Sequence, residues 1–202
     1  MPAYREPFLH LLMAHCGLPW IEAWELIGLF SKLAVIIGIP LLVIYWERRP
    51  LSSIGVRRLM VRDLLAAMAT LLACFYLIDP LVLWVADRAP AMSSQMIAGG
   101  AMYASLPKLL DWASLISGGI AEEVGFRGYA IERIEEMTGS TFVGASVPFV
   151  VNVLAHTGVW GWYGMLSKAP LLLPLVILYV WRRNLPACAL VHILFDVVVF
   201  EL

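Results

Sequence analysis

The hydrophobic positions of the chain form long runs that polar residues rarely interrupt. Six such segments span residues 24–46, 64–86, 109–130, 141–160, 162–181 and 185–201. A helix needs about 20 apolar residues to cross the hydrocarbon core of a bilayer. In lipid the backbone must be hydrogen-bonded internally, and these runs lack the alternation of a transmembrane barrel strand. The pattern therefore predicts an all-α, polytopic integral membrane helical bundle with about six transmembrane helices.

The intervals between these segments predict a single membrane domain in two parts. Residues 1–108 hold an N-terminal amphipathic segment and two transmembrane helices, and residues 109–202 hold a four-helix catalytic core. The first 23 residues are broken by prolines and lack the basic start of a cleaved signal peptide, which is therefore not expected. The longest polar stretches, 47–63 and 87–108, are expected to be loops.

Basic residues divide unequally between the two sets of intervals. One set carries nine, namely Arg48, Arg49, Arg57, Arg58, Arg62, Arg127, Arg133, Arg182 and Arg183. The other set carries four, namely Arg5, Arg88, Lys108 and Lys168. Because cytoplasmic loops carry the excess of lysine and arginine, we expect a non-cytoplasmic N-terminus, in the plasma membrane of a bacterium or an archaeon.

Composition narrows the classes of function. Of the 202 residues, 61% are hydrophobic and 14% are charged, with a net charge of −1. Nucleic-acid binding needs a concentrated basic surface, so a nucleic-acid partner is not expected. The expected partner is the lipid bilayer. Cys16, Cys74 and Cys188 are far apart and lack metal-ligand spacing, so we interpret them as small core residues.

Candidate chemistry comes from ionisable residues inside the apolar segments. Each such residue is unfavourable in the bilayer by about 2.5 kcal/mol or more, and therefore needs a partner or a function. Five of them fall in the last four segments: Glu122, Glu123, His156, His192 and Asp196. Their clustering predicts one functional site between neighbouring helices.

Spacing gives these residues an expected geometry, because residues four apart share one face of a helix. Glu123 is four residues before Arg127 and is expected to form an ion pair with it. By the same rule Asn152 aligns with His156, and His192 with Asp196. Glu122 is rotated by about 100° from Glu123 on an α-helix and is expected to keep its carboxylate free. Glycines near these positions allow the helices to approach closely.

The three motifs resemble those of the CPBP family, the CAAX-protease and bacteriocin-processing membrane enzymes. The family pattern is Glu-Glu-x-x-x-Arg, then Phe-x-x-x-His, then His-x-x-x-Asn or Asp. Here the motifs read Glu122-Glu123-Val-Gly-Phe-Arg127, Asn152-Val-Leu-Ala-His156 and His192-Ile-Leu-Phe-Asp196. The second motif departs from the pattern, since Asn152 stands where the family has Phe. The resemblance covers residues 109 to 202.

The resemblance implies an intramembrane endopeptidase of the glutamic type that needs no metal or cofactor. Its partner is a membrane-associated or lipid-modified peptide or protein substrate. Glu122 is then the general base that activates water, and His156 holds that water or relays its proton. His192 donates to the oxyanion, and Asp196 either donates with it or orients it. Glu123, Arg127 and Asn152 are supporting residues.

Other functions fit the same residues. A zinc protease would use the carboxylates and histidines as ligands, although the chain lacks a His-Glu-x-x-His motif. A membrane scaffold or self-immunity protein would bind a transmembrane peptide in an idle polar pocket. A proton-coupled carrier would use the same groups as a relay, but no inverted repeat supports it.

The topology can be checked with reporter fusions. Fusions after Arg58, Arg133 and Arg183 are expected to report the cytoplasm, and fusions after Arg88 and Lys168 the opposite side. The physical reason is the retention of arginine-rich loops on the cytoplasmic face. A reversed pattern of reporter activity would contradict this orientation.

Overall fold

The structure is a computed structural model that describes residues 6–201, and this part of the chain is helical nearly throughout, with no strand. Its α-helices are α1 (Glu6–Cys16), α2 (Trp20–Leu41), α3 (Val61–Ala73), α4 (Asp79–Asp87), α5 (Pro90–Ala104), α6 (Lys108–Glu122), α7 (Glu132–Thr138), α8 (Thr141–Ala155), α9 (Thr157–Gly164), α10 (Lys168–Arg182) and α11 (Leu185–Glu201). Three π-helices continue them, η2 (Leu42–Trp46), η4 (Cys74–Ile78) and η5 (Glu123–Ile131). Two 3₁₀-helices, η3 (Leu51–Ile54) and η6 (Met165–Ser167), complete the set.

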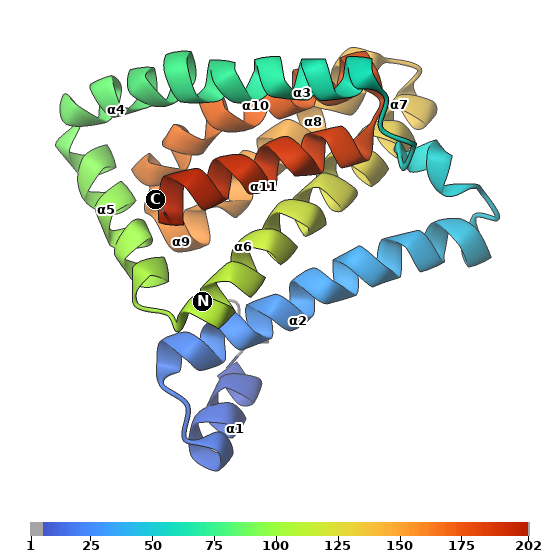
Figure 1. Ribbon diagram of the computed structural model, residues 1–202. Coiled ribbons are helices and arrows are strands. Elements are labelled where there is room, and N and C mark those ends of the chain that lie inside the picture. Colours follow the sequence, from blue (N-terminus) through green and yellow to red (C-terminus); the bar gives the residue numbers. More distant parts are fainter. Residues whose placement is uncertain (1–5, 202) are drawn as a thin grey trace.

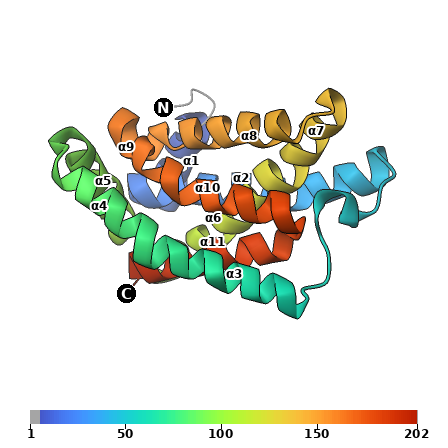
Figure 2. The ribbon, with the colours of Figure 1, turned by 90° about the horizontal axis from the view of Figure 1, so that it is seen from above.

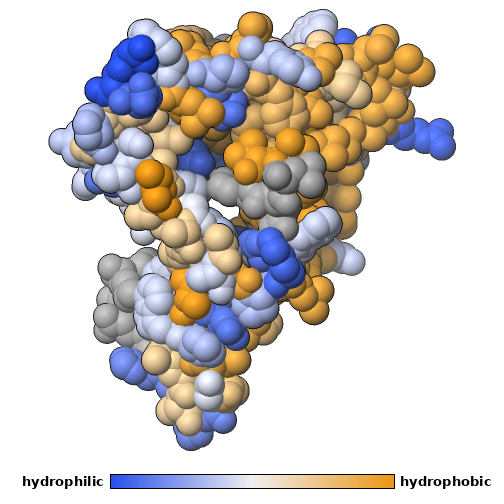
Figure 3. Space-filling model, turned by 60° about the vertical axis from the view of Figure 1, so that its left-hand side comes forward, coloured by the Kyte–Doolittle hydropathy of each residue, from blue (hydrophilic) through white to orange (hydrophobic). Residues whose placement is uncertain are grey.

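Several helices are long and apolar enough to cross a membrane. Among the described residues three stretches meet both conditions, Trp20–Trp46, Val61–Asp87 and Thr157–Arg182, and Thr141–Ala155 and Leu185–Val199 are shorter apolar helices. The expected segments 24–46 and 64–86 correspond to the first two stretches. Broad hydrophobic areas on the outer surface suit contact with lipid (Figure 3). The chain is an all-helical integral membrane protein, and the count of six spans stays a prediction.

Two of the expected boundaries were wrong. The interval 87–108 contains helix α5, which begins with Pro90 in the first turn, a position that proline favours. Gly99 of α5 lies against Trp160, where a Cβ atom would come within 2.4 Å of the indole ring, so only glycine allows this close packing. The segment 141–160 is divided at His156, and α9 is bent at Gly161, whose φ of 70° favours glycine.

The helices pack around one core cluster. Figure 1 shows α3 and α4 running as one long helix across the top of the bundle, with α5 descending from its end. The view from above shows α8 and α9 along one side and α3 along the other (Figure 2). Between them, the buried side chains of Ile131, Leu178, Tyr179, Cys188 and Val191 belong to one hydrophobic cluster. In the first part of the chain, α2 packs on α6 and α3 packs on α11.

Charged side chains gather at the end of the bundle where η2 ends and α7 begins. Arg133 donates hydrogen bonds to Glu47 at 3.0 and 3.1 Å, and Arg183 pairs with Glu132 at 3.0 Å and with Glu135 at 2.6 Å. Arg127, which was counted among the loop arginines, is instead buried inside the bundle. Its place beside Glu123 explains the difference, because an ion-paired arginine can remain inside the bundle.

The Glu47–Arg133 contact is expected to make stability depend on pH. The hydrogen bonds from Arg133 hold the pKa of Glu47 below its ordinary value, which is about 4.3. A carboxyl whose pKa is lowered by folding stabilises the protein above that ordinary pKa and loses this contribution as pH falls through the folded-state pKa. Wild type should therefore unfold at a higher temperature than Glu47→Gln at pH 6, with the gap closing below about pH 4.

Thermal unfolding in detergent at several pH values measures this gap. Glu22→Gln, at a residue for which the structure gives no ion pair, is the matched control. A gap that stays constant down to pH 3 would contradict the assignment.

Candidate active site

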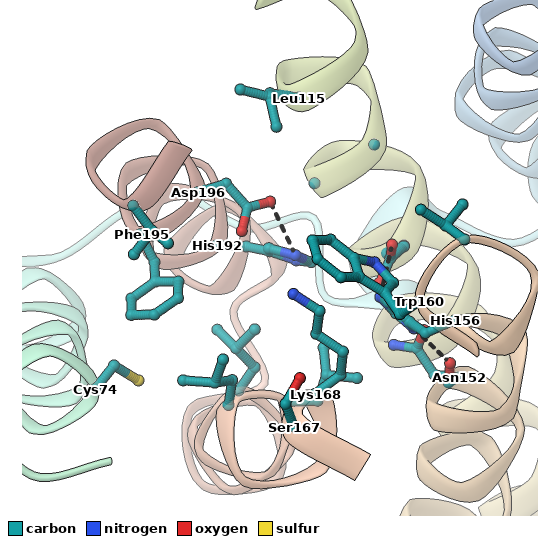
Figure 4. A pocket seen from close by; sticks show the side chains of 18 of the residues that line it. Cys74, Leu115, Asn152, His156, Trp160, Ser167, Lys168, His192, Phe195 and Asp196 are labelled. Atoms are coloured by element: carbon teal, nitrogen blue, oxygen red, sulfur yellow. Dashed lines mark hydrogen bonds and ion pairs between the residues drawn. The ribbon is translucent and has the colours of Figure 1, made fainter. Parts of the chain in front are cut away.

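The candidate catalytic residues line one cavity of about 630 Å³ inside the bundle. Glu122 comes from the last position of α6, His156 from the junction of α8 and α9, and His192 and Asp196 from α11. Figure 4 shows several of these side chains pointing into the same space. The structure thus brings together the four residues that the sequence singled out on separate helices.

Close approach of the helices depends on glycine at two positions. A Cβ atom at Gly119 of α6 would lie 3.0 Å from Ile193 and 3.7 Å from the ring of His192, so a larger residue would push α11 away. A Cβ atom at Gly128 would lie 2.8 Å from the carbonyl oxygen of Ile54. Between them, η5 replaces the expected α-helix by a π-helix, a form that occurs frequently at functional sites.

Glu122 and His156 form the first pair of the site. Glu122 Oε1 lies 3.8 Å from His156 Nε2. The Nδ1–H of His156 donates to the backbone carbonyl of Asn152 at 2.8 Å, which leaves Nε2 as the acceptor nitrogen of the neutral ring. Glu122 Oε2 has no hydrogen-bond partner among the described residues. The carboxylate group as a whole lines the cavity with 28% of its side chain exposed, so it is open to a molecule there.

Glu123 is engaged differently from its neighbour. Its side chain is fully buried, and its Oε1 lies 3.3 Å from Arg127 Nη1 and 2.8 Å from His192 Nδ1. The first contact is the ion pair expected from the spacing. The second was missed, because spacing within one helix does not reveal that α11 would cross η5 at this point. Glu123 thus lies between two donors instead of facing the cavity.

The second pair of the site lies on α11. His192 Nε2 is 3.5 Å from Asp196 Oδ2, as drawn in Figure 4. Since Nδ1 of the same ring faces Glu123, His192 is held at both nitrogens by carboxylates. A carboxylate on each side fixes the orientation of the imidazole ring.

Asn152 contributes its backbone where a side-chain contact was expected. Its carbonyl oxygen accepts from His156, while its side-chain amide is buried beside the cavity without a hydrogen-bond partner among the described residues. Asn152 and His156 therefore share a helix face as expected, but they are joined through the backbone carbonyl of Asn152.

Three residues of the site were not found by sequence reasoning. Lys168 was counted as a loop cation, but it lines the cavity together with Trp160 and Tyr103. Lys168 Nζ lies 3.5 Å from the centre of the Trp160 ring, and that ring stacks on Tyr103. Tyr103 belongs to helix α5, which closes this side of the cavity. It was missed because the interval 87–108 was expected to form a loop.

A further polar cluster borders the cavity between α2 and α6. Lys32 Nζ lies 2.6 Å from Glu25 Oε1 and donates to Ser114, which in turn donates to Glu25. The cluster connects the two helices inside the bundle.

The polar residues are arranged as pairs. Among the described residues no three His, Cys, Asp or Glu side chains gather in a way that could hold a metal ion. The pairs instead offer a carboxylate beside an acceptor nitrogen at Glu122 and His156, and a carboxylate-held imidazole at His192. Such groups can move a proton and can donate to developing negative charge.

The helical membrane fold and a buried acid–base cavity define an integral membrane protein with an enzyme-like site. Residues 105–198 match the model of the family described as type II CAAX prenyl endopeptidase Rce1-like, and this confirms the resemblance to the CAAX-protease family. The Rce1-like family is a family of proteases, and the matched segment contains every motif residue discussed above. No curated protein and no solved structure gives a match.

Removing the charge of Arg127 is expected to destabilise the protein. Glu123 is completely buried, and breaking a buried ion pair on one side costs about 3 to 5 kcal/mol. Arg127→Met should lower the free energy of unfolding by this order, and activity should fall because Glu123 also holds His192. Unfolding by titration with sodium dodecyl sulfate measures the loss.

The double variant Glu123→Gln/Arg127→Met distinguishes the stability lost with the ion pair from the stability lost through altered packing. It should recover part of the lost stability, since no buried charge is left without its partner. Arg57→Met, at an exposed arginine, is the matched control. Equal stability of Arg127→Met and wild type would show that the pair does not contribute.

Proposed function

We propose that the protein is an intramembrane endopeptidase that hydrolyses a peptide bond with a water activated by Glu122. The observation that carries the proposal is the unequal use of the two neighbouring glutamates. Glu123 is fully buried and bound by Arg127 and His192, whereas Glu122 lines the cavity with a partly exposed side chain beside His156. This difference supports the choice of Glu122 as the general base.

The pair can carry out both proton transfers of the reaction. Glu122 accepts a proton from water as the oxygen of that water bonds to the carbonyl carbon. The acceptor nitrogen of His156, fixed by its bond to the Asn152 carbonyl, can share this proton with Glu122 and deliver it to the leaving nitrogen. When the carbon–nitrogen bond breaks, the amine leaves neutral and the acid product retains the new oxygen.

The opposite pair supports stabilisation of the intermediate. The carbonyl oxygen becomes an oxyanion when water adds, and donors aimed at it lower the barrier. His192 Nε2 lies at the cavity wall and only loosely contacts Asp196 at 3.5 Å. Protonated on both nitrogens between Glu123 and Asp196, the ring would donate from Nε2 to the oxyanion while Asp196 orients it.

The family match suggests the kind of substrate. The matching family is that of CAAX prenyl endopeptidases, and a membrane-associated or prenylated peptide fits a cavity surrounded by membrane helices. Apolar side chains such as Leu115, Phe195 and Val199 line the same space. They favour hydrophobic substrate residues over charged ones.

The decisive test is cleavage by Glu122→Gln. This change keeps the size of the side chain but removes the basic oxygen, so the protein should fold while the rate drops about 100- to 10,000-fold. His156→Ala should lose activity on the same scale. Rates are measured with purified protein and prenylated or unmodified membrane peptides, with and without chelator.

Controls separate the alternatives. Glu22→Gln makes the same chemical change away from the cavity and should cleave like wild type. Wild-type cleavage by Glu122→Gln would show that the glutamate mechanism is wrong. Loss of wild-type activity with chelator would favour a zinc protease, and peptide binding without cleavage a scaffold.

A further inference from the structure

Two lysines, Lys32 and Lys168, line the cavity in different surroundings. Lys32 is held by Glu25 and Ser114 between α2 and α6. Lys168, the first residue of α10, instead places its ammonium over the face of Trp160 at 3.5 Å from the ring centre. In Figure 4 its side chain extends toward His192 and Asp196.

The position of Lys168 is fixed by the elements around it. Ser167 is buried and donates to the carbonyl of Gly164 at 2.6 Å, which holds the short turn of η6 before α10. Trp160 stacks on Tyr103 from α5. A cation over an aromatic face is attracted by the ring without using up its N–H donors in conventional hydrogen bonds.

Few of the other polar groups around the cavity have a hydrogen-bond donor available for the carbonyl oxygen of the substrate. Asp196 accepts hydrogen bonds only, as long as it is ionised. His156 uses its Nδ1–H on the carbonyl of Asn152, and His192 has a carboxylate at each ring nitrogen. Hydrolysis would add an oxyanion to a cavity that Glu122 and Asp196 already line.

Lys168 is the cation placed to balance this charge. Lys168 lines the cavity together with Asp196, Glu122 and Asp79, whose carboxylates attract its ammonium. An ammonium carries three donors, so it can face these carboxylates and still direct a hydrogen at a substrate oxygen. A donor at a developing oxyanion in a site shielded from water contributes more than the same contact in water.

We propose that Lys168 is a catalytic residue that donates a hydrogen bond to the oxyanion of the tetrahedral intermediate, alongside His192. The inference rests on the proposed function. As the water oxygen bonds to carbon, the carbonyl electron pair moves to oxygen and is stabilised by the ammonium, which keeps its proton. When the carbon–nitrogen bond breaks, that pair re-forms the carbonyl, and the amine takes the proton that Glu122 accepted from water and passed on through His156.

The test compares kinetic constants of purified wild type, Lys168→Met and Lys168→Arg on one membrane peptide. Lys168→Met keeps the length of the side chain without its charge, and should lower kcat about 100- to 1,000-fold with KM nearly unchanged. Lys168→Arg should retain part of the rate. Lys108→Met, at an exposed lysine near the start of α6, is the matched control and should behave like wild type.

Chemical rescue gives a readout that a structural role would not move. Propylammonium should restore part of the activity of Lys168→Ala and should not raise that of wild type or Glu122→Gln. Thermal unfolding identifies variants that do not fold, and Lys168→Met and Lys168→Ala leave two chances for a folded neutral variant.

The outcomes separate the two proposals. Unchanged kcat in a folded neutral variant overturns the role of Lys168 while leaving the glutamate mechanism in place, and so does a raised KM with normal kcat. Wild-type cleavage by Glu122→Gln overturns the proposed mechanism instead. A wild type that cleaves no membrane peptide overturns both.

Discussion

A carboxylate with no exposed surface must be compensated inside the protein, and Glu123 is the residue where this constraint is strictest. Leaving an ion without partners in a medium of low dielectric costs several kcal/mol. One oxygen of Glu123 meets both Arg127 of η5 and His192 of α11. Compensation of the Glu123 charge therefore connects two helices that carry different motifs. It also fixes the ring of His192, which lines the other side of the cavity.

The same constraint orders the remaining polar groups. Glu25, Lys32 and Ser114 satisfy one another between α2 and α6, and Asp63 is bound by Arg182 and Asn184 at the end of α10. These contacts take place inside the bundle, where lipid offers no alternative partner. Glu122 is distinguished by lining the cavity with a partly exposed side chain.

Much of this arrangement could be predicted from the chain, because apolar length and i, i+4 spacing are local properties. The first two membrane segments, the Glu123–Arg127 pair and the alignment of His192 with Asp196 follow from them. The contact of Glu123 with His192 could not be predicted, since it depends on how two helices cross. Helix α5 was missed because its small and polar residues resemble a loop, and with it the placement of Lys168 was missed.

The helical path from Lys108 to Thr138 is continuous and joins the cavity to the charged end of the bundle. It runs through α6, η5 and α7. Glu122, Glu123 and the carboxylates that pair with Arg133 and Arg183 therefore lie on one continuous helix. The π-helical stretch η5 determines how the side chains at one end of this helix are rotated about its axis relative to those at the other end. A single-residue insertion or deletion within it would turn the charged end relative to the cavity, so the number of residues in this stretch fixes which way the two ends face.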